Sequence, residues 1–283
     1  MSNPIPLLIS GLPGRMALEV ARLALDRESD SPFTLLPFAL TGPNMEAETF
    51  AFGDGRSVRL VRPQDRDSLQ IPPGSIAVDF TEPAAALPNV EFYSRKGIPF
   101  VLGTTGYDRD RALELVRQSG TSAVIAPNMA IPIVLLQSAM HWLAGRFPGA
   151  MAGYQFGVLE SHQSGKKDTS GTAKALVSDF AALGLPASVD KIKMIRDAKV
   201  QEQELNVPLE HISGHAYHFY EIASDTADIR LELSHRVHGR KVYAEGALTA
   251  VRFLHQKLNA GSKNEIFNMT DVLEAMPAPK KPG

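Results

Sequence analysis

The amino-acid sequence predicts an α/β protein with two domains. The first is a Rossmann-like parallel sheet with helices on both faces, and the second is an α+β domain with a mostly antiparallel sheet. The chain has 283 residues, a length typical of two domains rather than one. Its first half alternates short, continuous apolar runs with amphipathic segments, as parallel strands buried on both faces do. After about residue 128, longer helical segments and then β-forming segments follow.

The first half begins with an apolar run at residues 5–10 that ends in a Gly-rich turn, so we expect a strand there. A helix is expected at residues 15–26, where Met16, Val20 and Leu23 recur at helical spacing. Further strands are expected at residues 33–40, 75–80, 98–102 and 122–125, with helices at residues 84–96 and 108–119. Pro88 interrupts one of these helices and argues against its continuity.

The second half is predicted to combine helices with an antiparallel sheet. Its expected helices cover residues 131–147, 172–183, 246–258 and 270–275. Its expected strands cover residues 153–161, 192–195, 216–222 and 229–237. From residue 189 on, the segments are rich in β-forming residues, which indicates an α+β domain with a mostly antiparallel sheet.

Composition excludes several classes of protein. Lys and Arg total 29 and Asp and Glu total 31, a net charge of −2, so no basic surplus is present for nucleic acid or an anionic membrane. The absence of cysteine excludes disulfides, thiolate metal sites and a cysteine nucleophile. No apolar run is long enough to span a bilayer, and residues 1–4 lack the basic start of a secretory signal. We expect a cytoplasmic protein.

A phosphate-binding turn is predicted between the first strand and the first helix. The pattern Gly11-x-x-Gly14-x-x-Ala17 allows a sharp turn and a close backbone approach to a pyrophosphate at the helix N-terminus. Arg15 adds a positive charge beside the phosphates, whereas Pro13 removes one N–H donor. The alternative is an ordinary strand–turn–helix with glycine in the turn, which the spacing alone does not exclude.

The expected cofactor is NADPH, with NADH possible. Proteins that prefer NAD usually carry an acid at the end of the second parallel strand, where it binds the ribose 2′-hydroxyl. In this sequence the corresponding run ends in Thr41-Gly42-Pro43, and the next acid is Glu46. A missing acid removes a repulsion against a 2′-phosphate, which favours NADPH.

A second loop, Gly103-Thr104-Thr105-Gly106, follows the apolar run at residues 98–102. It is expected at the carboxyl end of a parallel strand, where such sheets bind ligands. Its glycines, hydroxyls and N–H groups can contact a nicotinamide or a substrate carboxylate. Phe80, within the segment Asp79–Pro83, is expected at the same edge of the sheet. Plain turns are the alternative for both segments.

The segment from Glu160 to Ala173 is the most informative stretch, because a strand is followed by a polar loop and then a helix. The free N–H groups at the helix start, with the hydroxyls of Ser170 and Thr172, suit a carboxylate. Lys166 can donate a proton, and His162 titrates near neutrality. Together they predict a small anionic substrate. The alternative is a solvated polar loop ahead of a capped helix.

No metal site is expected. His211, His215 and His218 would share one face of a helix and could then resemble a ligand set. The neighbouring aromatic residues favour a strand instead. Side chains alternate along a strand, so His218 is expected to point away from the other two.

Taken together, these motifs resemble the 4-hydroxy-tetrahydrodipicolinate reductase family, formerly called dihydrodipicolinate reductases, of the diaminopimelate route to lysine. The resemblance covers nearly the whole chain. The matching segments are Gly11–Met16, Asp79–Thr81, Gly103–Gly106, Ala126–Met129 and Glu160–Ala173. The segments Thr41–Pro43, Glu160–Gln163 and His211–His215 are more similar to the plant-type branch.

The resemblance implies a reaction and a domain arrangement. A pyridine nucleotide gives a hydride to C4 of a cyclic, unsaturated imine dicarboxylate, which forms from the 4-hydroxy compound by loss of water. A proton is then added to give tetrahydrodipicolinate. Residues 1–128 are implied as the dinucleotide-binding domain, with residues 243–283 returning to it, and residues 129–242 as the substrate-binding and oligomerisation domain. A homo-oligomer is expected, a tetramer as in the family or a dimer as in its plant-type branch.

The resemblance also implies roles for individual residues. His162 corresponds to an acid–base residue of the family and Lys166 to its proton donor. Expected substrate contacts are Thr104, Gln163, Ser170, Gly171 and Thr172. Expected cofactor contacts are Gly11, Leu12, Pro13, Gly14, Arg15, Met16, Thr41, Phe80, Gly103, Thr104, Thr105, Pro127, Asn128, Met129 and Ala130.

The chain departs from the family pattern beside these residues. Most bacterial members carry a second histidine where Gln163 stands, and the usual Asp-Ala-Pro-Ser-Gly-Thr is shortened to Asp168-Thr169-Ser170-Gly171-Thr172. Lys166 keeps the family spacing from His162, so Lys166 rather than Lys167 is the expected proton donor. The alternatives are a related NAD(P)H-dependent reductase of another cyclic imine and a non-catalytic NADPH-sensing protein.

Overall fold

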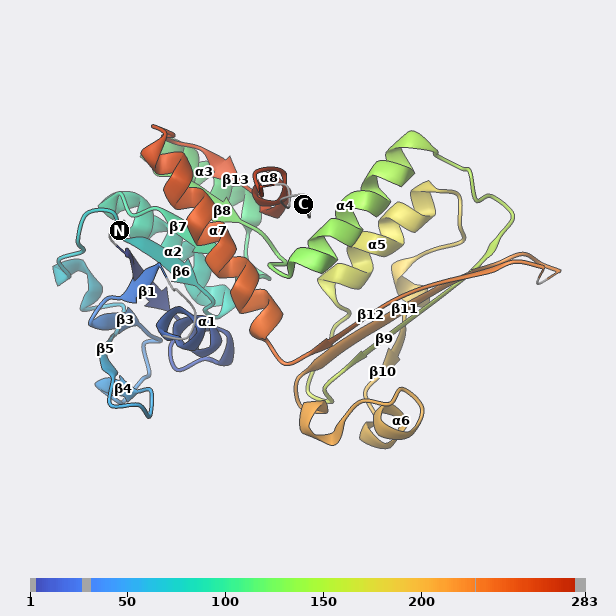
Figure 1. Cartoon of the computed structure of the whole chain (residues 1–283), viewed down its shortest axis with the longest axis horizontal. Coiled ribbons are helices and arrows are strands. Elements are labelled where there is room, and N and C mark those ends of the chain that lie inside the picture. The colour runs from blue at the N-terminus through green and yellow to red at the C-terminus, as the bar shows by residue number, and fades with distance from the viewer. Residues whose placement is uncertain (1–3, 27–31, 227, 278–283) are drawn as a thin grey trace, which may run out of the picture. The chain divides into compact units, whose positions relative to one another are not determined.

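The computed structural model describes residues 4–26, 32–226 and 228–277 (Figure 1). The chain divides into two compact units, residues 1–131 with 241–283, and residues 132–240. The family resemblance implies boundaries a few residues away, at 128/129 and 242/243. The two units are described one at a time.

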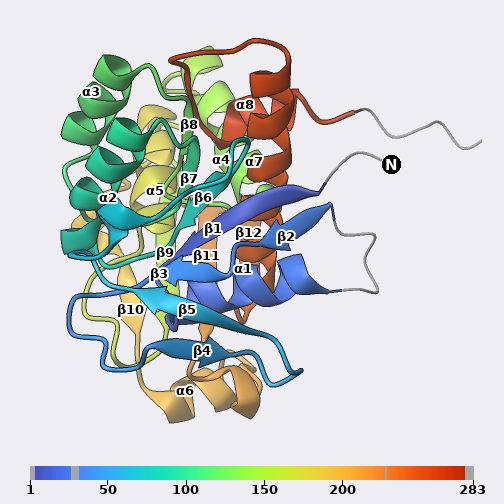
Figure 2. The ribbon, with the colours of Figure 1, turned by 90° about the vertical axis from the view of Figure 1, so that its left-hand side faces the viewer.

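The first unit is built on a mostly parallel sheet in the order β13-β8-β7-β6-β1-β3-β5-β4, with β2 also paired to β1. Figure 1 labels β13, and Figure 2 shows the order from β8 to β4. Its strands are β1 (Ile5–Ser10), β2 (Phe33–Leu35), β3 (Phe38–Leu40), β4 (Thr49–Ala51), β5 (Ser57–Val61), β6 (Ile76–Asp79), β7 (Phe100–Leu102), β8 (Ala123–Ile125) and β13 (Ile266–Phe267). The edge strand β4 runs antiparallel to β5. In β1 the run Leu7–Ile9 is fully buried, as expected of a central parallel strand.

Helices cover both faces of this sheet, which confirms the Rossmann-like prediction. They are α1 (Arg15–Leu25), α2 (Pro83–Lys96), α3 (Arg109–Ser119), α7 (Lys241–Asn259) and α8 (Met269–Glu274), with a 3-10 turn at Arg66–Ser68. α2 packs beside α3, while α1 packs beside α7, which lies against β6, β7 and β8. Gly246 allows α7 to approach the chain at Met129, since a Cβ there would lie 1.6 Å from the Met129 carbonyl oxygen.

Proline divides one of the predicted elements and leaves another intact. The single strand expected at residues 33–40 is divided into β2 and β3, because Pro37 has no N–H for the ladder. Pro88 does not end α2, which is continuous from Pro83 to Lys96. Pro88 removes the helical hydrogen bond to the Ala84 carbonyl, and both residues are exposed, so this loss occurs on the solvent side of α2.

The second unit carries a sheet in the order β10-β9-β11-β12. Its strands are β9 (Gln155–His162), β10 (Lys193–Ile195), β11 (His215–Ala223) and β12 (Arg230–His238). Its helices are α4 (Ile131–Arg146), which starts at the boundary residue, α5 (Gly171–Ala182) and α6 (Ala198–Gln203), with 3-10 turns at Val189–Lys191 and Leu209–His211. β11 pairs antiparallel with β9 and β12, and β10 pairs parallel with β9, so the mostly antiparallel sheet is confirmed.

One face of this second sheet packs on α4 and α5. Val158 and Tyr220 from the sheet form a buried cluster with Leu176 and Phe180 of α5. Because side chains alternate along a strand, Glu160 and His162 lie on the same face as Val158. The helix-covered face of the sheet therefore continues from an apolar core into a buried polar cluster.

Candidate active site

The predicted phosphate-binding turn lies between β1 and α1. Gly14 is the N-cap of α1, and no side chain caps this helix. Gly11 has φ +110°, and a Cβ there would lie 2.5 Å from the carbonyl oxygen of Phe80, so the turn requires glycine. An uncapped helix N-terminus leaves backbone N–H groups for an anion.

A pocket of about 470 Å³ adjoins this turn. Six predicted cofactor residues line it, namely Gly11, Leu12, Pro13, Gly14, Thr41 and Phe80. Four residues of segments singled out in the sequence also line it, namely Gly42, Pro43, Thr81 and Glu82. The sequence did not indicate the other lining residues, namely Asn44, Met45, Pro63, Ala85 and Asn89. The hydroxyl of Thr41 donates to the carbonyl of Leu12 at 2.6 Å, which joins the end of β3 to the turn.

The remaining predicted cofactor residues lie elsewhere in the first unit. Arg15, Met16, Gly103, Thr104, Thr105, Pro127, Asn128, Met129 and Ala130 do not line the pocket. Met129 and Ala130 are buried, at 2% and 0% exposure, so their side chains face the core. Asn128 Oδ1 accepts a hydrogen bond from the N–H of Ala130 at 3.0 Å, which fixes the turn after β8.

Thr104 was predicted to contact a ligand, but its hydroxyl makes hydrogen bonds within the protein. Its hydroxyl oxygen lies 3.1 Å from Asp79 Oδ1 and accepts from the N–H of Thr81 at 2.9 Å. Asp79 is fully buried, and Asn89 and Tyr93 also donate to its carboxylate. The sequence did not indicate this network, which ties the ends of β6 and β7 together.

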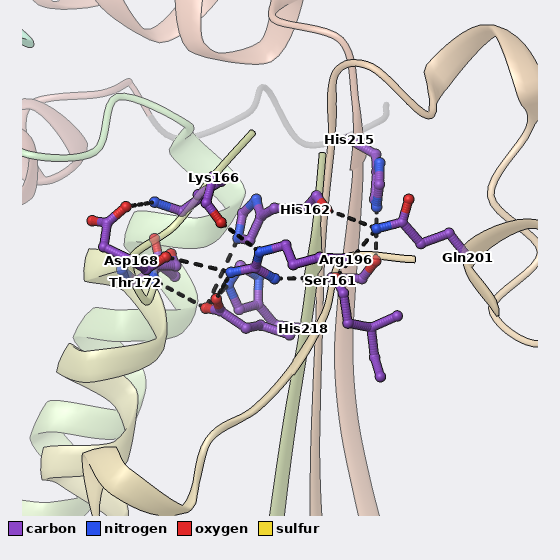
Figure 3. A network of polar contacts seen from close by, with 12 residues as sticks. Ser161, His162, Lys166, Asp168, Thr172, Arg196, Gln201, His215 and His218 are labelled. Carbon is purple, nitrogen blue, oxygen red and sulfur yellow. Dashed lines mark hydrogen bonds and ion pairs between the residues drawn. The ribbon is translucent and has the colours of Figure 1, made fainter. Parts of the chain in front are cut away.

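The predicted acid–base residues of the second unit are His162, the last residue of β9, and Lys166, in the loop between β9 and α5 (Figure 3). Ser170 is the N-cap of α5, and its hydroxyl accepts from the N–H of Thr172 at 3.2 Å. Gly171, at the first helical position, is exposed. The first turn of α5 therefore presents backbone N–H groups beside the loop.

His162 directly precedes a short turn from Gln163 to Lys166, in which the Lys166 N–H donates to the Gln163 carbonyl at 3.0 Å. Lys166 Nζ donates to Asp168 Oδ1 at 3.0 Å, and the lysine side chain is 23% exposed. Gln163 is half-buried. The structure thus brings Lys166, His162, Gln163 and the start of α5 into one segment.

A buried charge pair, which the sequence did not single out, supports this segment. Arg196, directly after β10, donates from Nη2 to Glu160 Oε1 at 2.5 Å. Glu160 is fully buried, and its Oε2 accepts from the N–H of Ser170 at 2.9 Å. Burial alone would raise the pKa of Glu160, but the nearby His218, Arg196 and Ser170 lower it to about 2. Glu160 is therefore a carboxylate at neutral pH.

His162 and His218 approach the same carboxylate oxygen. Their Nε2 atoms lie 3.9 Å and 3.7 Å from Glu160 Oε2. Burial, followed by the neighbouring His218, holds the pKa of His162 well below its usual value, so its imidazole is neutral. Within the described part of the chain, His162 Nε2 and both ring nitrogens of His218 and His235 have no hydrogen-bond partner.

Glu160, His162 and His218 offer ligand atoms within 4.8 Å of one another, close enough in principle for a metal ion. The charges nearby oppose metal binding, because Arg196 already forms an ion pair with Glu160 and the positive charge of Lys166 acts on His162. A positive surrounding of this kind favours an anion. The set also differs from the histidines considered in the sequence, since His215 hydrogen-bonds Ser161 on the other face of the sheet at 2.8 Å.

The fold and these sites are typical of a dinucleotide-binding protein, with a Rossmann-like unit that carries a glycine turn and a separate unit that carries a buried polar cluster. Residues 5–129 match the family model of the dihydrodipicolinate reductase N-terminus, and residues 132–273 match that of its C-terminus. The chain belongs to the dihydrodipicolinate reductase family.

Curated relatives agree with this assignment, and a solved structure shares the fold. The chain is 38% and 39% identical, over 276 residues, to chloroplastic 4-hydroxy-tetrahydrodipicolinate reductases 1 and 2 of Arabidopsis thaliana, covering 96% of this chain and 78% of each relative. The dipicolinate-bound dihydrodipicolinate reductase from Paenisporosarcina sp. TG-14 superposes with a TM-score of 0.58 at 17% identity, covering 94% of this chain and 97% of that chain. The plant-type resemblance is thereby confirmed, and the solved structure supports the fold.

The comparisons also correct one expectation. A cytoplasmic location was expected, but the Arabidopsis relatives and two from Oryza sativa subsp. japonica are named as chloroplastic, so that expectation is wrong. The expectation was based on the lack of a membrane-spanning run and of a secretory signal, and the lack of these features does not identify a compartment. Among the described residues, no helix has the length and apolarity needed to cross a bilayer.

Proposed function

We propose that this protein reduces 4-hydroxy-tetrahydrodipicolinate to tetrahydrodipicolinate with NADPH. Family membership supports the reaction. The observation that carries the proposal is the segment from the end of β9 to the start of α5, which holds His162, Lys166 and the N-terminus of α5 together. A proton donor, a neutral imidazole and a carboxylate-binding helix end are the groups that such a substrate requires.

The residues of the first unit fit a dinucleotide. The pocket of about 470 Å³ and the uncapped start of α1 suit a pyrophosphate beside Gly11 and Gly14. The bound nicotinamide nucleotide supplies the hydride. NADPH is favoured because the lining after β3, from Thr41 to Met45, contains no carboxylate to repel a 2′-phosphate. The acid in the described lining, Glu82, precedes α2 instead.

Substrate carboxylates are assigned to the start of α5. The Ser170 hydroxyl accepts a hydrogen bond from the N–H of Thr172. The N–H of Gly171, at an exposed position, is then the donor assigned to the substrate. Gln163, half-buried beside the loop, can donate its amide to a carboxylate. The positive end of α5 adds a favourable dipole for the anion.

Lys166 is assigned as the proton donor. After water leaves the 4-hydroxy compound, hydride arrives at C4 and a proton must be added to the same unsaturated system, which gives tetrahydrodipicolinate. Lys166 carries an exchangeable proton on a partly exposed ammonium group. His162 is buried and neutral, so it is suited to accept or orient a hydrogen bond rather than to be the first source of the proton.

We also propose that the chain forms a homo-oligomer. α4 exposes Leu135 and Trp142, at 60% and 62%, and Phe147 follows at 45%. An exposed apolar face of this kind is typical of an interface. Sedimentation equilibrium tests the proposal, since a dimer or tetramer is expected and a monomer at micromolar concentration would contradict it.

The function is tested by following NADPH oxidation at the nicotinamide absorbance, with substrate made in situ by the preceding synthase from pyruvate and aspartate semialdehyde. Turnover that depends on both precursors is the expected result. Gln163 and the shortened loop favour a second candidate, a reductase of another cyclic imine. Turnover of such an imine, with none of the lysine intermediate, would replace the first proposal by the second.

A further inference from the structure

Arg196 reaches several groups of the loop between β9 and α5 at once. Besides its bond to Glu160, its Nε donates to the carbonyl of Lys166 at 2.8 Å. Its Nη2 lies 3.4 Å from the carbonyl of Asp168. The side chain is 18% exposed, so these contacts are largely shielded from water. Arg196 is remote in sequence from this loop, which it meets only through the fold.

Glu160 continues the same connection to the other side of the loop. Glu160 lies in β9, two residues before the strand ends at His162. Its Oε2 accepts from the N–H of Ser170, the N-cap of α5. Gln201 in α6 donates to the backbone carbonyl of His162 at 2.7 Å and so restrains the backbone of that residue. One carboxylate and one guanidinium therefore join the residues before, within and after the loop (Figure 3).

The loop has few other restraints. Among the described hydrogen bonds of residues 163–169, those between Lys166 and Gln163 and between Lys166 and Asp168 are internal to the loop. The bonds that reach it from other elements come from Arg196. A loop held from outside by one side chain should change its conformation when that side chain changes.

We infer that Arg196 is a positioning residue, which acts through Glu160 and the loop carbonyls to fix Lys166 and the start of α5 for the reaction. This inference rests on the proposed function. The planar guanidinium can donate to a carboxylate and to carbonyls in different directions at once, whereas an ammonium group is a single point. A lysine at this position would keep the charge and lose the shape, and that difference is testable.

The test compares Arg196→Lys with Arg230→Lys as a matched control. Arg230 lies on β12 of the same sheet and forms exposed ion pairs with Glu221 and Glu232, away from the loop. For Arg196→Lys we expect kcat/KM for the dicarboxylate to fall by about 10- to 100-fold, because small misplacements of reacting groups have such effects. NADPH affinity, a property of the first unit, should stay within about twofold, as should every constant of the control.

Three further readouts separate positioning from general destabilisation. Amide hydrogen exchange at residues 163–170 should become about tenfold faster in Arg196→Lys and stay unchanged in Arg230→Lys. Glu160→Gln should resemble Arg196→Lys, and the double variant should lose little more than either alone, since both act through one connection. Binding of pyridine-2,6-dicarboxylate should weaken in parallel.

The inference is overturned if Arg196→Lys keeps kcat/KM within about twofold of wild type, or if exchange in the loop does not change. Parallel loss of NADPH affinity would also overturn it, because that result assigns Arg196 to general folding. If the wild type is inactive but amide hydrogen exchange at residues 163–170 is still faster in Arg196→Lys, only the proposed function is contradicted.

Discussion

The phenol of Tyr93 donates to the carboxylate of Asp79 at 2.8 Å, and neither side chain is exposed. The same hydroxyl lies 2.6 Å from the Ser10 hydroxyl, so α2 is joined to the ends of β1 and β6 through one group. Burial raises the pKa of Asp79, opposed by its hydrogen bonds to Thr81, Tyr93 and Asn89. A buried carboxylate therefore organises the edge of the sheet that carries the candidate cofactor pocket.

Tyr93→Phe should lower the free energy of unfolding by about 1–3 kcal/mol, because a buried carboxylate loses one donor without gaining another. Chemical denaturation of both proteins measures this difference. Tyr154→Phe, at a partly exposed tyrosine in the second unit, serves as the control and should be close to neutral. Equal stability of wild type and Tyr93→Phe would contradict the role given to Asp79.

Gly11→Ala should abolish measurable NADPH binding. The added Cβ would lie 2.5 Å from the Phe80 carbonyl oxygen at a φ of +110°, so the turn must distort. Strain of this kind costs about 1–3 kcal/mol of stability as well. Gly145→Ala, in the exposed face of α4 with open space around it, is the control that should bind normally. Fluorescence titration with NADPH distinguishes them, and tight binding by Gly11→Ala would refute the assigned turn.

Asn44→Asp should shift the cofactor preference toward NADH. Asn44 lines the pocket just after β3, where a carboxylate would repel a 2′-phosphate and accept from a 2′-hydroxyl. The ratio of kcat/KM for NADPH to that for NADH should fall by about tenfold, with Asn44→Ala showing a smaller change. An unchanged ratio in Asn44→Asp would place the 2′-phosphate elsewhere.

His235 predicts a pH dependence of stability. Burial, followed by the neighbouring His218, lowers its pKa from 6.5 to about 4. Between these values the unfolded chain binds a proton that the folded chain does not, so the free energy of unfolding falls as the pH falls. This contribution is constant above pH 6.5. The loss should amount to about 1–3 kcal/mol, allowing for partial solvent screening.

Urea unfolding of wild type and His235→Leu at about pH 7 and pH 4.5 measures this contribution as a difference. The variant should lose less stability on acidification than wild type. His141→Gln, at a histidine whose side chain is 86% exposed, is the control and should follow wild type. Parallel curves for wild type and His235→Leu would show that His235 is not the group responsible.

Much of the fold could be predicted because its main strands are local, continuous apolar runs. β1 was expected with the bounds that the structure shows, and β6, β7 and β8 differ by one or two residues at their ends. β4 and β5 were missed because β4 has only three residues, none of them buried, and β5 mixes polar and apolar residues instead of forming a continuous apolar run. β13, with only two residues, leaves no pattern in the sequence.

The candidate site shows the same limit. His162, Lys166 and Ser170 lie in one continuous segment, so their association needs no knowledge of the fold. Strand pairing instead sets His218 opposite Glu160 on one side and opposite His235 on the other. A sequence gives no register between distant strands. The alignment of Glu160, His218 and His235 across three strands, and the contact of Arg196 with Glu160, were therefore not predicted.

The central claim is that Lys166 supplies the proton that completes the reduction, and Lys166→Ala with Lys167→Ala as its neighbour control tests it directly. Single-turnover NADPH oxidation should slow by about 10²–10⁴-fold in Lys166→Ala, the usual contribution of a general acid, while Lys167→Ala stays near wild type. NADPH affinity should be unchanged in both. Lys166→Ala with a wild-type rate, or an equal loss in both variants, would contradict the account.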